Sequence, residues 1–377
     1  MSHLTVLDAI ATGHPPYRGS QAYAASFMER VTTVPAPIRR RLPAIYERSG
    51  IDYRHSCVED YLQADPADFT FFGPDWSLEP APTTAQRNAA YRAAAVPLAV
   101  DVARRALTEA DLAPEDVTHV VAVTCTGFFA PGLDILLTKQ LGLRPTVHRA
   151  VIGFMGCYAA LNALRVAHSF CQADPQARVL VVCVELCTLH FQVDDTMESA
   201  IVNSLFSDGA AAAVLSARPA DEAAGHLAYA GSHALVDEDS LDHMTWEIGD
   251  TGFLMGLSAR VPEVLARQLG PYLEGLLGPH GLTQADIDFW AIHPGGRAIV
   301  ERAQAVLDLP DEAVADSLAV LRDHGNMSSP TILFVLQRFL RRHQQAQNEE
   351  AEGLRQGIAL AFGPGLTLEG AVFKRVG

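Results

Sequence analysis

The sequence is poor in basic residues, and this scarcity sets the first limit on what the protein binds. Its 377 residues include 28 Lys and Arg against 44 Asp and Glu, a formal net charge of −16. Binding to nucleic acid phosphates needs a basic surface, so nucleic acid is not expected as a partner. Residues 37–48 depart from this balance with four arginines and one glutamate. This segment is either a solvated helix face or a place where an anionic small molecule binds.

Long apolar runs and an export signal are also missing. The longest apolar runs, such as residues 95–100 and 179–184, have the length of strands and are too short to span a bilayer. The first residues do not combine a basic region with an apolar core, as a secretory signal would. We therefore expect a cytoplasmic protein without a membrane partner.

The six cysteines form no CxxC pair. Cys183 and Cys187 are four residues apart, but no histidine at the spacing of a metal ligand completes a site with them. We therefore expect no zinc site and no other metal site. Without an export signal, the thiols are expected to be reduced.

Helical and strand patterns alternate from residue 84 onward. A helical pattern covers residues 84–110, with an interruption expected near Pro97, while the first 85 residues show only short helical patterns and loops. The alternation predicts an α/β fold. Strands are predicted at 117–124, 150–153, 179–185, 208–216 and 289–293, and helices at 131–142 and 157–171.

The second half of the chain repeats the pattern of the first. Residues 112–123 and 282–292 each place a leucine and an acidic residue ahead of a strand, and residues 208–214 resemble 368–372 near the end of each half. Two matches in the same order indicate an internal duplication. We place the join near residues 217–225, which divides the chain into an N-terminal half, 1–217, and a C-terminal half, 218–377.

Three polar residues lie at the ends of predicted elements. Cys157 follows a strand and begins a helix, where the helix dipole favours a thiolate. His293 ends a strand ahead of Pro-Gly-Gly, and Asn326 lies in a loop between two helical patterns. Each has a structural explanation when taken alone: a buried thiol, a histidine that caps a strand, and a turn residue.

Together, the segments that contain these residues resemble the signatures of type III polyketide synthases, the chalcone and stilbene synthase family. The resemblance extends over roughly residues 5–376 and suggests a bacterial member. It rests on GCYAA (156–160), IHPGG (292–296), GNMSSP (325–330), AFGPGLTLE (361–369), CTGFFAPG (125–132), LTKQLGLRP (137–145) and LFSDGAAA (205–212).

The resemblance implies a thiolase-like, five-layered αβαβα fold of two pseudo-equivalent halves that works as a homodimer. It also implies that Cys157, His293 and Asn326 are the catalytic triad. Cys157, as a thiolate paired with an imidazolium at His293, would attack an acyl-CoA starter and hold the acyl group. His293 and Asn326 would then donate hydrogen bonds to the enolate oxygen left when malonyl-CoA loses carbon dioxide. Repeated condensation and cyclisation would follow, with CoA thioesters as substrates and no metal, other cofactor or carrier protein.

Further positions carry over from the family. Phe206 and Phe253 match the two phenylalanines between the CoA tunnel and the cavity, although a core aromatic is the alternative reading for Phe253. Arg41 and Arg48 fall near the residues that meet the CoA phosphates, but Ala44 occupies another of those places. Ser328 matches a serine behind the triad, and other positions line the cavity of family members: Cys125, Thr126, Ala130, Cys187 and His190.

Some residues depart from the plant pattern, and we expect these departures to bear on the product. Plant members usually have Gly-Cys-Phe-Ala-Gly-Gly around the expected nucleophile. Here Tyr158, Ala160 and Leu161 occupy the places of the phenylalanine and the last two glycines. Ala130 is small where plant enzymes often carry a methionine that reaches into the partner's cavity. These observations favour pyrones or resorcinols made from an aliphatic starter.

Two alternatives stay open. The first is an initiating ketoacyl-acyl-carrier-protein synthase, which shares the Cys-His-Asn trio. The second is a catalytically silent relative that binds CoA or serves as a scaffold.

Overall fold

A nine-stranded mixed sheet runs through the computed structural model, which describes residues 3–348 and 355–377. The strand order is β11-β12-β13-β8-β1-β7-β6-β4-β5. The strands are β1 (His3–Gly13), β4 (His119–Thr124), β5 (His148–Gly153), β6 (Arg178–Leu186), β7 (Asp208–Pro219), β8 (Leu227–Val236), β11 (Phe289–Ile292), β12 (Gln356–Gly363) and β13 (Thr367–Arg375).

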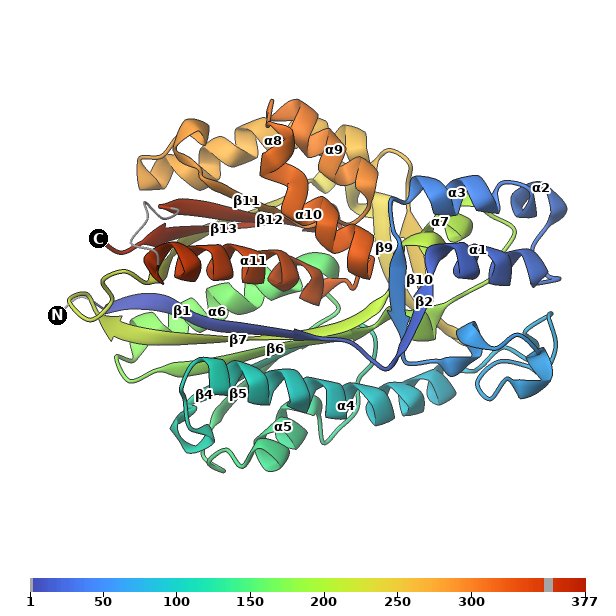
Figure 1. Cartoon of the computed structure of the whole chain (residues 1–377), viewed down its shortest axis with the longest axis horizontal. Coiled ribbons are helices and arrows are strands. Elements are labelled where there is room, and N and C mark those ends of the chain that lie inside the picture. The colour runs from blue at the N-terminus through green and yellow to red at the C-terminus, as the bar shows by residue number, and fades with distance from the viewer. Residues whose placement is uncertain (1–2, 349–354) are drawn as a thin grey trace.

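The sheet divides into two layers where β1 meets β8. These strands pair only at Thr5 with Tyr229 and at Val6 with Ala228, so the halves separate on either side. Helices fill the space between the layers and cover both outer faces, which confirms the expected five-layered αβαβα arrangement (Figure 1). The inner helices are α6 (Ala159–Ala173) and α11 (Ser329–Asn348); the outer ones are α4 (Thr84–Glu109) and α5 (Leu133–Leu141) on one side and α8 (Val261–Leu277), α9 (Arg297–Val306) and α10 (Asp311–His324) on the other.

The two halves repeat the same strand order outward from their junction. Counted from β1 and β8, the next pairs are β7 with β13, β6 with β12, and β4 with β11. The sequence matches described above fall on β4 with β11 and on β7 with β13, which confirms the duplication. The segment predicted as the join, 217–225, covers the last three residues of β7 and most of the loop that leads to β8.

Shorter elements gather at one end of the layers, at the right of Figure 1. They come mainly from the first 60 residues and from the segment after β6. They are β2 (Tyr17–Ser20), α1 (Gln21–Arg30), α2 (Ala36–Arg39), α3 (Leu42–Arg48), β3 (Tyr53–Ser56), α7 (Met197–Leu205), β9 (Met244–Gly249) and β10 (Gly252–Leu257).

Two expectations about the N-terminal half are wrong. The first residues form β1, a strand inside the sheet, rather than a loop; it is buried on both faces, so its sequence lacks the alternation of a half-exposed strand. Helix α4 continues through Pro97 instead of breaking there. Pro97 is exposed, so the carbonyl group one turn earlier, which loses its helical hydrogen bond, can be hydrated.

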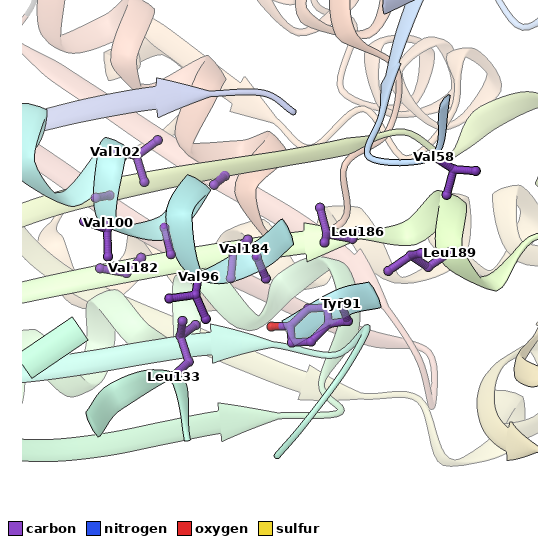
Figure 2. Close-up of a cluster of buried hydrophobic side chains, with 14 of the residues drawn as sticks. Val58, Tyr91, Val96, Val100, Val102, Leu133, Val182, Val184, Leu186 and Leu189 are labelled. Carbon is purple, nitrogen blue, oxygen red and sulfur yellow. The ribbon is translucent and has the colours of Figure 1, made fainter. Parts of the chain in front are cut away.

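The outer helix α4 is held to the sheet by an apolar cluster. Figure 2 shows Val96 and Val100 of α4 directed at Val182 and Val184 of β6, with Leu133 of α5 beside them. Burial of such side chains contributes about 1.5–3 kcal/mol each. Among the described residues, no helix combines the length and the hydrophobicity that crossing a membrane requires.

A buried carboxylate joins the central layer to the C-terminal sheet. Glu369 of β13 is 4 % exposed and accepts hydrogen bonds from Asn162 Nδ2 at 2.7 Å and Arg165 Nη1 at 2.8 Å, both on α6. The acidic residue of the AFGPGLTLE segment therefore has a structural role, because it fixes the helix that follows Cys157.

Replacement of this carboxylate tests that role. We expect Glu369→Ala to lower the free energy of unfolding by about 2 kcal/mol, because it leaves Asn162 and Arg165 without their acceptor. Urea denaturation measures the change. Glu301→Ala is the control: it breaks an exposed ion pair with Arg297 and should cost no more than about 0.5 kcal/mol. Equal costs for the two variants would contradict the assignment.

Candidate active site

Cys157 lies in a 3-10 turn, Gly156–Tyr158, directly before α6. The turn is tight, since Gly156 has φ +73° and a Cβ placed there would lie 2.6 Å from Pro364 Cδ. Only glycine accommodates both the backbone angle and this close approach. The helix expected to begin at Cys157 therefore begins just after this turn, at Ala159. The loop between β12 and β13, which contains Pro364, packs against the turn.

Asn326 lies beside Cys157 with its amide orientation fixed. Its Oδ1 accepts a hydrogen bond from Ser328 N at 2.8 Å, and its Nδ2 donates to Gly295 O at 3.0 Å. The same Nδ2 lies 4.0 Å from Cys157 Sγ. An amide held in this way turns its nitrogen, and not its oxygen, towards the sulfur, so the N–H that is not bonded to Gly295 O is available there.

His293 follows β11 and is 1 % exposed. Its ring and the Asn326 amide flank Gly295, because a Cβ at Gly295 would lie 3.6 Å from His293 Nε2 and 4.0 Å from Asn326 Nδ2. Within the described part of the chain, neither ring nitrogen of His293 has a hydrogen-bond partner. Buried polar atoms without partners are uncommon, and they are typical of sites that bind or react.

Burial acts on both ionisable groups in the direction of their neutral forms. It raises the pKa of the Cys157 thiol to about 11 and lowers the pKa of His293 to about 3. Hydrogen bonds from Ser328 and Asn326 act in the opposite direction on the thiol. Burial therefore penalises a lone thiolate or a lone imidazolium, whereas transfer of a proton from the thiol to the ring would create two charges that stabilise each other.

Glu185, which the sequence analysis did not single out, organises the walls around the thiol. This fully buried carboxylate at the end of β6 accepts hydrogen bonds from Cys125 N at 2.9 Å, Thr126 Oγ1 at 2.7 Å and Ser329 Oγ at 2.7 Å. Desolvation raises its pKa, and these bonds oppose that shift. The carboxylate thus joins the loop after β4 to the start of α11. No spacing pattern in the sequence marks it.

A cavity of about 1380 Å³, its open mouth included, begins at Cys157. It extends to the short elements at the end of the layers, where side chains of α1 and α7 form its walls. His293 and Asn326 are buried next to it. Seven of the predicted site residues line it: Cys125, Thr126, Cys187, His190, Phe206, Phe253 and Ser328.

His190 and Phe253 form one side of the cavity as a stacked pair. Their ring centroids are 4.1 Å apart, with an angle of 8° between the planes. His190 Nδ1 accepts a hydrogen bond from Phe253 N at 3.0 Å, so its Nε2 carries the proton and donates to Thr126 O at 2.6 Å. The histidine therefore fixes Phe253 at the cavity wall in a neutral form. Burial lowers the pKa of His190 to about 4.

Comparisons with known proteins agree on one family. The N-terminal domain of chalcone and stilbene synthases matches residues 3–219, and the C-terminal domain of the same family matches residues 228–377. The chain belongs to the chalcone and stilbene synthase family. It is therefore a type III polyketide synthase, an acyltransferase that forms carbon–carbon bonds.

Individual relatives cover nearly the whole chain. The alpha-pyrone synthesis polyketide synthase-like Pks18 of Mycobacterium tuberculosis is 36% identical over 372 residues, 98% of this chain and 91% of that protein. PKS-I from the brown alga Ectocarpus siliculosus is 38% identical with a TM-score of 0.95, covering 100% of this chain and 99% of that one. The type III domain of Steely1 from Dictyostelium is 27% identical with a TM-score of 0.86, covering 99% and 100%. These likenesses confirm the thiolase-like fold.

Three family positions lie away from the cavity of their own chain. Arg41 and Arg48 are exposed at the two ends of α3 and do not line it, and Ala130 lies on the exposed surface. Arg54, which the sequence analysis missed, does line it. Its guanidinium is already bonded, with Nε donating to Gln21 Oε1 at 2.8 Å and Nη1 donating to Phe206 O at 2.9 Å.

The departures after the nucleophile do not reach the cavity. Tyr158, Ala160 and Leu161 are buried in the core between the layers, and Tyr158 packs against Gly363, where a Cβ would lie 2.6 Å from its ring. None of the three lines the cavity, so the expectation that they bear on the product stays a prediction. They adapt the packing of α6 to the β12–β13 loop.

The buried, neutral His190 predicts a loss of stability in mild acid. Because its pKa is about 4 when folded and near 6.5 when unfolded, the unfolded chain alone gains this proton as the pH falls from 6.5 to 4. The resulting loss in the free energy of unfolding grows through this pH window to about 3 kcal/mol and stays constant at lower pH. His190→Gln keeps one donor and one acceptor but does not titrate. Urea denaturation at several pH values should show the wild type losing its advantage over His190→Gln as the pH falls; a constant difference would exclude this titration.

Proposed function

We propose that the enzyme condenses malonyl-CoA repeatedly onto an aliphatic acyl-CoA starter held on Cys157 and closes the product to a pyrone or resorcinol. This proposal rests on the cavity, which begins at this thiol and extends to apolar side chains on α1. Ala24 and Leu62 belong to its wall, together with Val202 of α7. An alkyl chain gains about 0.8 kcal/mol for each methylene group that such a wall removes from water. The name of Pks18, which refers to alpha-pyrone synthesis, agrees with this product class.

The chemistry follows from the buried trio. As Cys157 attacks the thioester carbonyl of the starter, its proton passes to His293, whose nitrogens are not occupied by protein groups. The Asn326 N–H that faces the sulfur and His293 then donate hydrogen bonds to the enolate oxygen left by decarboxylation. The enolate carbon attacks the thioester carbonyl on Cys157, which expels the Cys157 thiolate and leaves the lengthened chain on CoA. Cys157 then attacks this new thioester, takes the chain back and releases CoA. The proposed cycle uses CoA thioesters as substrates and calls for no cofactor.

We also propose that the enzyme works as a homodimer joined along β5. This strand is the edge of the sheet, and its Val151 is 57% exposed; Phe154 and Phe128 beside it are 39% and 54% exposed. An apolar sheet edge of this kind needs a covering partner. A second copy would supply one and would bring Ala130 close to the neighbouring site. Sedimentation equilibrium tests the dimer, and a monomer would contradict it.

The remaining family expectations belong to the same proposal. Arg41 and Arg48 at the ends of α3 are available to the CoA phosphates, because α3 also contributes Tyr46 to the cavity. A cytoplasmic location agrees with six cysteines that are all unpaired.

The length of the starter provides the direct test of the cavity. Ala24→Phe should fill the space along α1 and lower kcat/KM for long acyl-CoA starters by about tenfold or more, while short starters are less affected. Ala22→Phe is the matched control, because Ala22 is exposed on the same helix. Products are identified by mass spectrometry after incubation with malonyl-CoA and starters of increasing chain length. Exclusive use of an aromatic starter, or equal effects of the two variants, would contradict the proposal.

The role of His293 is tested through the reactivity of the thiol. In His293→Ala the proton acceptor is lost while the burial of Cys157 remains, so we expect the pH midpoint of its alkylation by iodoacetamide to rise towards about 11. The wild type should have a lower midpoint, because the ring accepts the proton. Mass spectrometry of the peptide that contains Cys157 separates it from the other five cysteines. Identical profiles would remove the ring from the mechanism.

Cys157→Ala distinguishes the alternatives. It should abolish condensation while the fold and CoA binding persist, whereas a silent relative would have no condensation to lose. Activity with malonyl groups on a carrier protein, and none with malonyl-CoA, would instead identify an initiating ketoacyl synthase.

A further inference from the structure

Three histidines from distant parts of the chain converge next to the active site. His14 follows β1, His55 lies in β3, and His324 is the last residue of α10. Each offers a ring nitrogen, and these three atoms all lie within 4.8 Å of one another. Among the described residues, this is the one group of three or more histidine, cysteine or acidic side chains close enough to share a metal ion.

The rings lack the hydrogen bonds that buried imidazoles normally make. His14 Nε2, His55 Nδ1 and His324 Nδ1 are buried, and each is without a hydrogen-bond partner in residues 3–348 and 355–377. A single unpaired nitrogen would be a local imperfection. Three of them in one cluster indicate a shared ligand, because each buried polar atom left unpaired costs about 1–3 kcal/mol.

The cluster is neutral at physiological pH, as metal binding requires. Burial lowers the pKa of His14 to about 2, and those of His55 and His324 to about 4. The positive charges of Arg18, Arg105 and Arg338 act in the same direction on one or more of the rings. The lone pairs are therefore available to a cation.

We propose that His14, His55 and His324 bind one Zn²⁺ ion, or a similar borderline divalent cation, in each chain. Three imidazoles are a donor set that such ions prefer, and Mg²⁺ and Ca²⁺ prefer oxygen. Since no carboxylate of the described residues lies close enough to join the three rings, the fourth ligand is an anion such as hydroxide or chloride. The site is distinct from the cysteines, where no zinc was expected, and it takes no part in the condensation.

Binding requires the rings to turn. His14 is stacked between the other two, with centroids 3.9 Å from His55 and 4.7 Å from His324 and interplanar angles of 25° and 18°. A metal ion lies in the plane of each imidazole that binds it, so rotation about the side-chain bonds replaces the stack when the ion enters. His55 also lines the active-site cavity, which gives the ion a route.

The ion would fasten the segment that carries Asn326. His324 is two residues ahead of Asn326, and His55 N donates to Ser207 Oγ at 2.9 Å while Ser207 N donates to Asn326 O at 2.8 Å. A metal held by His55 and His324 therefore links both sides of this junction. The expected consequence is a higher melting temperature in the loaded protein.

Cobalt binding tests the site. Full-length Cys157→Ala protein is stripped with a chelator and titrated with Co²⁺, whose visible absorption bands report tetrahedral coordination, and Zn²⁺ is then added as a competitor. Using Cys157→Ala makes the result independent of the proposed condensation and of its thiol. We expect one Co²⁺ per chain, displaced by Zn²⁺, and no thiolate-to-cobalt charge-transfer band.

Single substitutions identify the ligands. His14→Gln, His55→Gln and His324→Gln should each weaken Co²⁺ binding by more than the roughly 10–100-fold that loss of an outer-shell partner costs. His148→Gln is the matched control, because His148 is stacked on His119 in a pair that no third histidine joins among the described residues. Circular dichroism checks that each variant folds. If one variant does not fold, the other two still decide the test. The proposal would be overturned if protein with all three histidines gave no spectrum of tetrahedral cobalt, or if it showed a thiolate-to-cobalt band. Equal Co²⁺ binding by all four histidine variants would also overturn it.

Discussion

Two backbone hydrogen bonds join the halves of the chain beside Cys157, and the position of Asn326 in the proposed catalytic trio depends on them. Asn326 N donates to Leu205 O at 2.9 Å, and Ser207 N donates to Asn326 O at 2.8 Å. Leu205 and Ser207 belong to the N-terminal half, and Asn326 belongs to the C-terminal half. Because this pairing is between backbones, it fixes Asn326 relative to the segment that also places Phe206 on the cavity wall. The site is therefore built across the duplication.

The buried polar groups around this junction fall into two kinds. Glu185 and Asn326 make several hydrogen bonds each, and such fully satisfied networks define one geometry. The ring nitrogens of His293, and one nitrogen on each ring of the histidine trio, have no partner in the described chain. Groups of the first kind hold the walls in place. The unpaired nitrogens of the second kind can still form hydrogen bonds with a substrate or bind an ion. Leaving them unpaired lowers the stability of the fold.

Local patterns in the sequence predicted an α/β fold with an internal duplication, and the family resemblance implied the five layers and the trio. Cys157, His293 and Asn326 each lie in a glycine-containing turn, and the strands alternate with helices of ordinary length. Strand β1 was missed because it is buried on both faces and so has no alternation. Glu185 and the three histidines left no signal either, since their partners lie far away along the chain. Such contacts arise only when the layers assemble.

The residue after the nucleophile shows why motif differences alone do not predict specificity. Tyr158 departs from the plant pattern, yet its side chain packs in the core against Gly363, so the departure is a matched change in packing. The cavity is lined by family positions such as Cys125 and Ser328 and also by side chains of α1 and α7, where the family signatures are sparse. Interior packing constrains the residues around Cys157, whereas Ala24 of α1 and Val202 of α7 are only partly buried and can change with less effect on the core. It follows that differences in starter choice among such enzymes should lie in these elements more than in the segment next to the nucleophile.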